Sequence, residues 1–256
     1  MDDLQPYLNG IFRWIHVLAG ITWIGLLYFF NWVNSAFAPT LDADSKKKVI
    51  PELIPRTLYW FRWGAAWTWI SGVLLMAVVF YHQKLMWEGG ESHWGALPFV
   101  MLGVTYLGVF AYDAIVKTVL NTPQKAFFGG WAITTALFLF YRMGIDEVSY
   151  RGALIHIGGM YGTFMAFNVW YRIWPAQQKI ITAIKNGEAP DGDLAKLAGT
   201  RSKHNTYMSF VLVFTMLNEY SAGWGEHKDY IAAGFFLVSW GLCFHAYQKA
   251  AKVPGF

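Results

Sequence analysis

The chain of 256 residues is 55% hydrophobic and 19% aromatic but only 14% charged, whereas a soluble domain has about 25% charged residues. This composition excludes an ordinary soluble domain and favours a membrane protein, in which the 14 tryptophans would gather at the headgroup level. The formal charge of +4 is spread over many short segments, which argues against nucleic-acid binding, and the lone Cys243 excludes an internal disulfide and a covalently attached c-type haem.

Seven segments of the chain are predicted to cross the membrane as helices, because each is apolar over about the 20 residues that a span requires. In chain order they are Leu8–Ala36, Tyr59–Tyr81, Ala96–Val116, Ala126–Tyr141, Ala153–Trp174, His204–Tyr220 and Tyr230–Tyr247. The fourth segment is the shortest. The fold class that follows is all-α: a single polytopic transmembrane helical bundle that occupies residues 1–256.

The connections between these segments are expected to be short, with one exception. Five prolines fall between the predicted spans, where the missing backbone donor does least harm: Pro51, Pro55, Pro123, Pro175 and Pro190. The longest connection, residues 177–203, is predicted to hold a short amphipathic helix around Lys179–Lys185. The N-terminal residues 1–10 lack the basic segment and cleavage site of a signal peptide, so the first span is expected to remain in the mature protein.

The connections are alternately rich and poor in lysine and arginine, and cytoplasmic loops are enriched in these residues. The first connection has Lys46, Lys47, Lys48 and Arg56, and the third has Lys117 and Lys125. The fifth connection has Arg172, Lys179, Lys185, Lys196, Arg201 and Lys203. The C-terminal tail has Lys249 and Lys252. The second and sixth connections each have one lysine, Lys84 or Lys228, beside acidic residues. This alternation predicts an N-terminus outside and a C-terminus inside, and it supports the count of seven spans.

Ionisable residues within spans are rare and usually functional. Four histidines lie in or at the edge of predicted spans, His16 and His156 toward the outer face and His204 and His245 toward the inner face, whereas His82, His93 and His227 fall in outer loops and are expected to be solvated. Two pairs matched in depth are the arrangement expected for one or two b-type haems, each held by two histidines on facing helices. We therefore predict that these four histidines bind haem iron.

Small residues near the histidines favour the same interpretation, because a porphyrin can approach its ligand helix closely only where the neighbouring side chains are small. They are Gly20 near His16; Gly152, Gly159 and Thr163 near His156; and Gly234 and Gly241 near His245. The alternative is that the glycines serve plain helix packing and that the histidines hydrogen-bond neighbouring helices.

Three further polar residues lie within the predicted spans. Asp113 stands four positions before Lys117 on the same helical face, so the two are predicted to form an ion pair. Asn168 and Asn205 are polar enough to contact a ligand, but buried asparagines also bridge neighbouring helices, and both alternatives stay open.

Five stretches carry a recognisable pattern: RWIHVLAGITWIG (Arg13–Gly25), WFRWGAAWTWISG (Trp60–Gly72), RGALIHIGGMYGT (Arg151–Thr163), GEAP (Gly187–Pro190) and RSKHNTY (Arg201–Tyr207). In these stretches, and over most of its length, the chain resembles the membrane domain of the bacterial urate hydroxylase family. The resemblance implies oxidation of urate to 5-hydroxyisourate, electron transfer to a cytochrome c and a location in the bacterial inner membrane. The membrane histidines that recur in the family correspond to the four named above.

The chain also departs from the family pattern. Family members typically carry a C-terminal cytochrome c, which is absent here, so a c-type cytochrome or respiratory complex on the periplasmic face is the expected partner. The family pattern has an acidic residue where this chain has Gly64, another where it has Asn34 or Ser35, and a histidine where it has Glu219. These differences bear on the urate chemistry more than on the haem ligands.

The first hypothesis is therefore a membrane b-type cytochrome that oxidises a small donor, urate or quinol, and passes electrons to a separate c-type cytochrome. The second is a non-catalytic membrane subunit of a larger respiratory complex. A transporter is disfavoured, because the sequence has no pair of spans interrupted by glycine and proline and no membrane carboxylate suited to ion coupling.

Overall fold

The computed structural model describes residues 4–91, 94–144, 148–218 and 227–253. Nearly all of these residues are helical, and within the described ranges the only strand-like pairing is an isolated bridge between Trp87 and Val148. The α-helices are α1 (Gln5–Tyr28), α2 (Ser35–Phe37), α3 (Ala43–Leu75), α4 (Ala96–Thr118), α5 (Pro123–Leu139), α6 (Tyr150–Phe167), α7 (Trp174–Asn186), α8 (Gly192–Asn218) and α9 (Lys228–Ala250). The all-α prediction is confirmed.

Four π-helical turns continue the long helices: η1 (Phe29–Asn34) after α1, η3 (Met76–His82) after α3, η5 (Phe140–Gly144) after α5 and η6 (Asn168–Ile173) between α6 and α7. Short 3₁₀ turns, η2 (Ala38–Thr40) and η4 (Glu88–Gly90), lie in connections. A π-helical turn inserts an extra residue, so it rotates every side chain that follows it relative to an unbroken α-helix.

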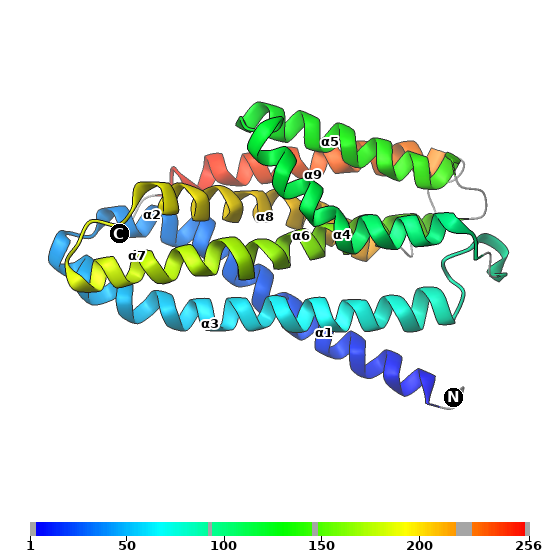
Figure 1. Ribbon diagram of the computed structural model, residues 1–256, viewed down its shortest axis with the longest axis horizontal. Helices are drawn as coiled ribbons and strands as arrows, with labels where there is room; N and C mark the ends of the chain where they lie inside the picture. The colour runs from blue at the N-terminus through cyan, green and yellow to red at the C-terminus, as the bar shows by residue number, and fades with distance from the viewer. Residues whose placement is uncertain (1–3, 92–93, 145–147, 219–226, 254–256) are drawn as a thin grey trace.

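Two of these rods are much longer than a bilayer requires. Together α3 and η3 form a helical segment of 40 residues, Ala43–His82, which at 1.5 Å per residue is about 60 Å long, twice the hydrocarbon thickness of about 30 Å. Residues 150–186 of α6, η6 and α7 are likewise continuous. In Figure 1 both rods extend at one end well past the turn between α4 and α5. Each rod is therefore too long to lie within one apolar layer, and we expect its basic end to project beyond that layer.

Pro51 and Pro55 lie in the predicted connection between the first two spans, but this connection is itself helical, and both prolines are inside α3. Helix α3 already begins at Asp42, whose side chain accepts a hydrogen bond from the Ser45 backbone N–H at 2.9 Å. This bond and a second from the Ser45 hydroxyl lower the pKa of Asp42. The prolines are tolerated because they occupy the projecting polar half of the rod, where water can satisfy the carbonyl groups that lose a donor.

The predicted amphipathic helix around Lys179–Lys185 is confirmed as α7, which packs against the first half of α3. Helix α7 ends at Gly187, where φ is +79°, a left-handed conformation that favours glycine. A Cβ atom at Gly187 would also lie 3.0 Å from Nζ of Lys47. The chain can therefore reverse sharply here and return as α8.

All seven predicted spans are helical in the part of the chain described, although Glu219 and Tyr220 at the end of the sixth lie outside it. Five helical segments are long and apolar enough to cross a membrane: Gln5–Thr40, Ala43–His82, Pro98–Thr118, Pro123–Gly144 and Lys228–Ala250. The chain is thus compatible with a multi-pass membrane protein. The start of α1 and the end of α9 lie at opposite ends of the bundle (Figure 1), as an odd number of spans requires. The count of seven spans and their orientation stay predictions.

Helix α6 is the centre of the bundle and packs against α3, α4 and α8. Every residue from 152 to 158 is buried, which covers the whole circumference of the helix over nearly two turns. By contrast, α1 lies at the edge of the bundle along α3 and exposes Trp14, Val17 and Ile21. The apolar faces that remain exposed on α1 are those expected to contact lipid.

We expect Gly152→Ala to destabilise the protein by about 1–3 kcal/mol, because a Cβ atom there would lie 2.6 Å from the Met86 carbonyl oxygen, which is fixed backbone. The matched control is Gly162→Ala on the same helix, where the nearest atom would be Cδ1 of Leu212 at 3.6 Å. The measurement is the unfolding midpoint of both variants in the same detergent. Equal stability of the two variants would show that α6 is not packed this closely at Gly152.

Candidate functional site

His156 is fully buried, and both of its ring nitrogens have hydrogen-bond partners. Its Nδ1 lies 2.7 Å from the carbonyl oxygen of Gly152, and its Nε2 lies 2.8 Å from the hydroxyl of Tyr81. Since a carbonyl only accepts, Nδ1 carries the proton and Nε2 accepts the hydrogen bond that Tyr81 donates. The side chain is therefore a neutral imidazole with its basic nitrogen turned toward a tyrosine.

Aromatic rings connect this pair to the surface. The ring of Tyr81, in η3, lies 5.9 Å from the ring of Trp87 and 5.4 Å from that of Trp94, which is exposed. On the other side, Tyr141 in η5 approaches His156 edge-on at 6.4 Å, and its buried hydroxyl has no hydrogen-bond partner among the described residues. We call His156, Tyr81 and Tyr141 the outer cluster.

A second polar group, formed by α4, η6 and α8, lies around the carboxylate of Asp113. Lys117 Nζ donates to it at 2.7 Å, which confirms the predicted pair. Arg172 donates from Nη2 at 2.6 Å and Nε at 3.1 Å, and Arg201 donates from Nη2 at 2.6 Å. We call these four residues the inner cluster. Arg172 and Arg201 were expected in a loop rather than in contact with Asp113. The sequence signal for this contact is that Asp113 lies within a span and its one predicted partner, Lys117, is on the same helix.

Tyr112, beside Asp113 on α4, extends the polar network toward α8. Its hydroxyl accepts a hydrogen bond from Asn168 Nδ2 at 2.9 Å and lies at hydrogen-bond distance, 3.1 Å, from Nδ1 of His204. Asn168 also donates to Oδ1 of Asn205 at 2.8 Å, and Asn205 donates to the Met165 carbonyl at 3.0 Å. Of the two interpretations of the asparagines, bridging between helices describes what they do here.

The predicted outer pair of haem ligands is not brought together. His16 lies 3.2 Å from the hydroxyl of Ser71, whereas His156 contacts Tyr81, ten residues further along the same rod. At 1.5 Å per residue this places the two contacts about 15 Å apart. Two ligands of one iron, each about 2 Å from it, would have to lie within about 4 Å of each other.

The predicted inner pair is not brought together either. His204 points to Tyr112 on α4, while Tyr207 and Tyr247 stack at 5.8 Å where α8 meets α9. His245, two positions before Tyr247, is on nearly the opposite side of α9 and is exposed. Both pairs therefore fail to fit a haem in this arrangement, and ligation by these four histidines remains a prediction from sequence.

The glycines on α6 support the packing alternative. A Cβ atom at Gly159 would lie 2.9 Å from Cε of Met76 and 3.2 Å from Cγ2 of Thr105, so neighbouring helices already fill the space that a porphyrin would need. Gly234 and Gly241 on α9 face outward, with no atom near their Cβ positions. Within the described residues, no three His, Cys, Asp or Glu side chains gather as a metal site would require. His82 and His227 are exposed, as predicted, and His93 lies outside the described residues.

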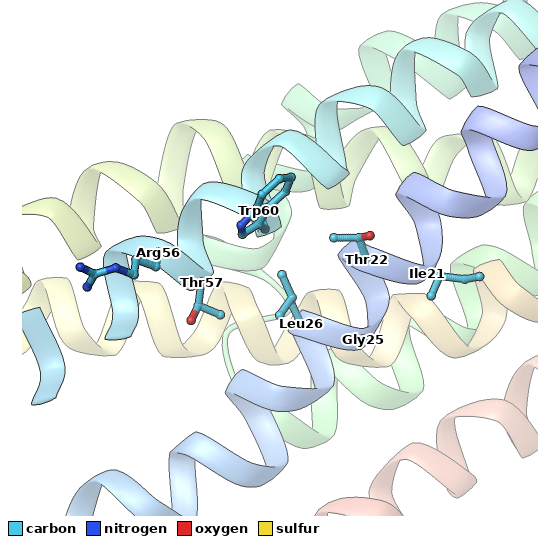
Figure 2. A pocket seen from close by; sticks show the side chains of 7 residues that line it. All are labelled: Ile21, Thr22, Gly25, Leu26, Arg56, Thr57 and Trp60. Atoms are coloured by element: carbon cyan, nitrogen blue, oxygen red, sulfur yellow. The ribbon is translucent and has the colours of Figure 1, made fainter. Parts of the chain in front are cut away.

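A crevice lies between α1 and α3, and Figure 2 shows its lining. Ile21, Thr22, Gly25 and Leu26 come from α1, and Arg56, Thr57 and Trp60 from α3. The crevice is open to the outside of the bundle, and its one charged side chain, Arg56, is paired with Glu52. It contains none of the residues of the outer or inner cluster, so it is not an enclosed site for a polar substrate.

Comparison with known proteins gives one match. A sequence model of the family described as Urate oxidase N-terminal matches residues 42–252, from the N-cap of α3 to just beyond the end of α9. No curated protein and no solved structure matches the chain. The matched region contains both clusters in full.

Substituting Asp113→Asn should destabilise the protein by about 3 kcal/mol, because it leaves Lys117, Arg172 and Arg201 together without their shared carboxylate. The control is Glu52→Gln, which removes the exposed pair with Arg56 and should change the stability far less, because water screens that pair. The measurement is the free energy of unfolding of both variants, obtained by chemical denaturation in detergent. Similar losses in the two variants would mean that the inner cluster does not stabilise the bundle.

Proposed function

The chain belongs to the Urate oxidase N-terminal family, and from this membership we propose that it is an integral-membrane oxidoreductase that oxidises urate. The family match, which covers most of the chain, is the observation that carries the proposal. The outer cluster supports it, because a neutral imidazole with an accepting Nε2 is a group able to take up a proton in the reaction.

The reaction balances as follows. Conversion of urate to 5-hydroxyisourate adds the oxygen of one water molecule and releases two protons and two electrons. We propose that two molecules of a separate c-type cytochrome on the outer face each accept one electron. Tyr81 passes its hydroxyl proton to Nε2 of His156 through their hydrogen bond at 2.8 Å and takes up one of the two protons in its place, while the other proton is released to water. The exposed Trp94 beside Tyr81 places this pair close to the surface where the cytochrome would dock.

The proposed reaction does not use haem b. When bound, it would supply a one-electron carrier within the membrane. The two histidine pairs expected to hold it do not fit the plate in the observed packing, so no step of the proposed reaction depends on it.

The second candidate is a non-catalytic subunit of a larger respiratory complex. Its supporting observation is the outward face of α9, where Gly234, Gly241 and His245 are exposed and uncovered. Small residues on a membrane helix permit close approach of another helix. The two candidates differ in whether the chain reacts with urate when no other membrane protein is present.

For the membrane arrangement we propose seven spans in the bacterial inner membrane, with the N-terminus outside. A reporter fused after Phe256 should therefore read cytoplasmic, because the projecting ends of α3 and α7 carry Lys47 and Lys179 on the side where the chain also ends. The measurement is the activity ratio of a reporter active only in the cytoplasm to one active only in the periplasm. A periplasmic signal would reverse the orientation.

The function is tested by adding urate and a purified c-type cytochrome to the purified chain and following cytochrome reduction. We expect two cytochromes reduced per urate, and a fall in kcat of about 100-fold or more in Tyr81→Phe and His156→Gln with little change in KM. His245→Gln, on the exposed face of α9, should keep the activity of the unmodified chain. An inactive unmodified chain that co-purifies with a respiratory complex would favour the second candidate instead.

A further inference from the structure

The inner cluster has more positive charge than its single carboxylate neutralises. Lys117, Arg172 and Arg201 all donate to Asp113, which leaves a formal surplus of two positive charges near the end of the apolar layer. Charges taken out of bulk water need a counter-charge, because their solvation is lost and their repulsion is only weakly screened. The cluster is therefore incomplete as an isolated group of side chains.

Arg201 also has a buried hydrogen-bond donor without a partner. Its side chain is only 3% exposed, and its Nη2 donates to Asp113. Its Nη1 is buried without an acceptor among the described residues. The guanidinium lies over the ring of Tyr112 at 5.2 Å and cannot lose its charge by deprotonation. A buried charged donor without an acceptor is unfavourable, so the cluster lacks an acceptor as well as a negative charge.

The cluster is partly exposed at Lys117 on α4 and at Arg172 in η6. There the side chain of Lys117 is 55% exposed and that of Arg172 is 30% exposed. Exposed aromatic rings lie on the same elements: Phe110 is on α4, about two turns before Lys117, and Tyr171 directly precedes Arg172 in η6. Basic and aromatic side chains at the end of an apolar helix are typical of the headgroup level of a membrane.

We propose that the inner cluster binds the phosphate group of an anionic membrane lipid at Lys117 and Arg172. A phosphate oxyanion accepts hydrogen bonds from ammonium and guanidinium groups and supplies the missing negative charge. Basic pockets between membrane helices on the cytoplasmic side are a recurrent site for such headgroups. Free inorganic phosphate offers the same oxyanion but no acyl chains to pack on Phe110 and Tyr171, so a lipid is the expected source.

The test measures lipid binding by the purified full chain in detergent, by native mass spectrometry and by the shift of its unfolding midpoint. The probes are phosphatidylglycerol, phosphatidylcholine with the same acyl chains and inorganic phosphate at equal phosphorus concentration. We expect phosphatidylglycerol alone to bind and stabilise. Arg172→Gln and Lys117→Gln should each weaken its binding about fivefold. The control Lys125→Gln, an exposed lysine in the first turn of α5, should leave binding within twofold.

The proposal is overturned if phosphatidylglycerol binds both variants as tightly as the unmodified chain, or if phosphatidylcholine stabilises equally. Equal stabilisation by inorganic phosphate would also overturn it, because the site would then take a free anion. Lys117→Gln keeps the test decisive if Arg172→Gln folds poorly, since the Lys117 side chain is the more exposed. No step of the test measures urate oxidation, so the two proposals can fail separately.

Discussion

The enclosure of α6 by other helices is the constraint on which the rest of the structure depends. Because residues 152–158 are buried on every side, any polar group on this helix must find its partner within the protein. His156 does so through the carbonyl of Gly152 and the hydroxyl of Tyr81. The same requirement joins Asn168 to Asn205 and so ties α6 to α8. Polar pairs and small residues together fix which helix faces meet.

This constraint produces two clusters of different character at the two ends of the bundle. The outer cluster contains only neutral groups, a histidine and two tyrosines, and is suited to moving a proton. The inner cluster gathers three cations around Asp113 at the end where basic residues accumulate. That difference follows from the distribution of lysine and arginine along the chain, which places permanent charge on one side of the apolar layer. Chemistry and anchoring can thus be assigned to separate ends of one helical bundle.

Sequence reasoning predicted what depends on local pattern. Apolar length identified the helices, the amphipathic segment identified α7, and the spacing of Asp113 and Lys117 identified their ion pair. It could not predict contacts between helices, such as that of Arg201 with Asp113, because these depend on how the rods pack. The depth of a histidine was inferred from its place in a span, which assumes rods of equal length. Here α3 and its π-helical turn extend over 40 residues, and that turn also sets the direction of Tyr81.

Whether the buried polar groups are satisfied by one another or by a haem is the central question, and one spectrum answers it most directly. The purified chain, expressed in cells with ample haem, would be assayed by the pyridine haemochrome method together with His16→Ala and His156→Ala variants. Mutual pairing of the side chains predicts no b-type haem in stoichiometric amount. A full equivalent of haem b in the unmodified chain, lost in either variant, would contradict the observed packing and restore bis-histidine ligation.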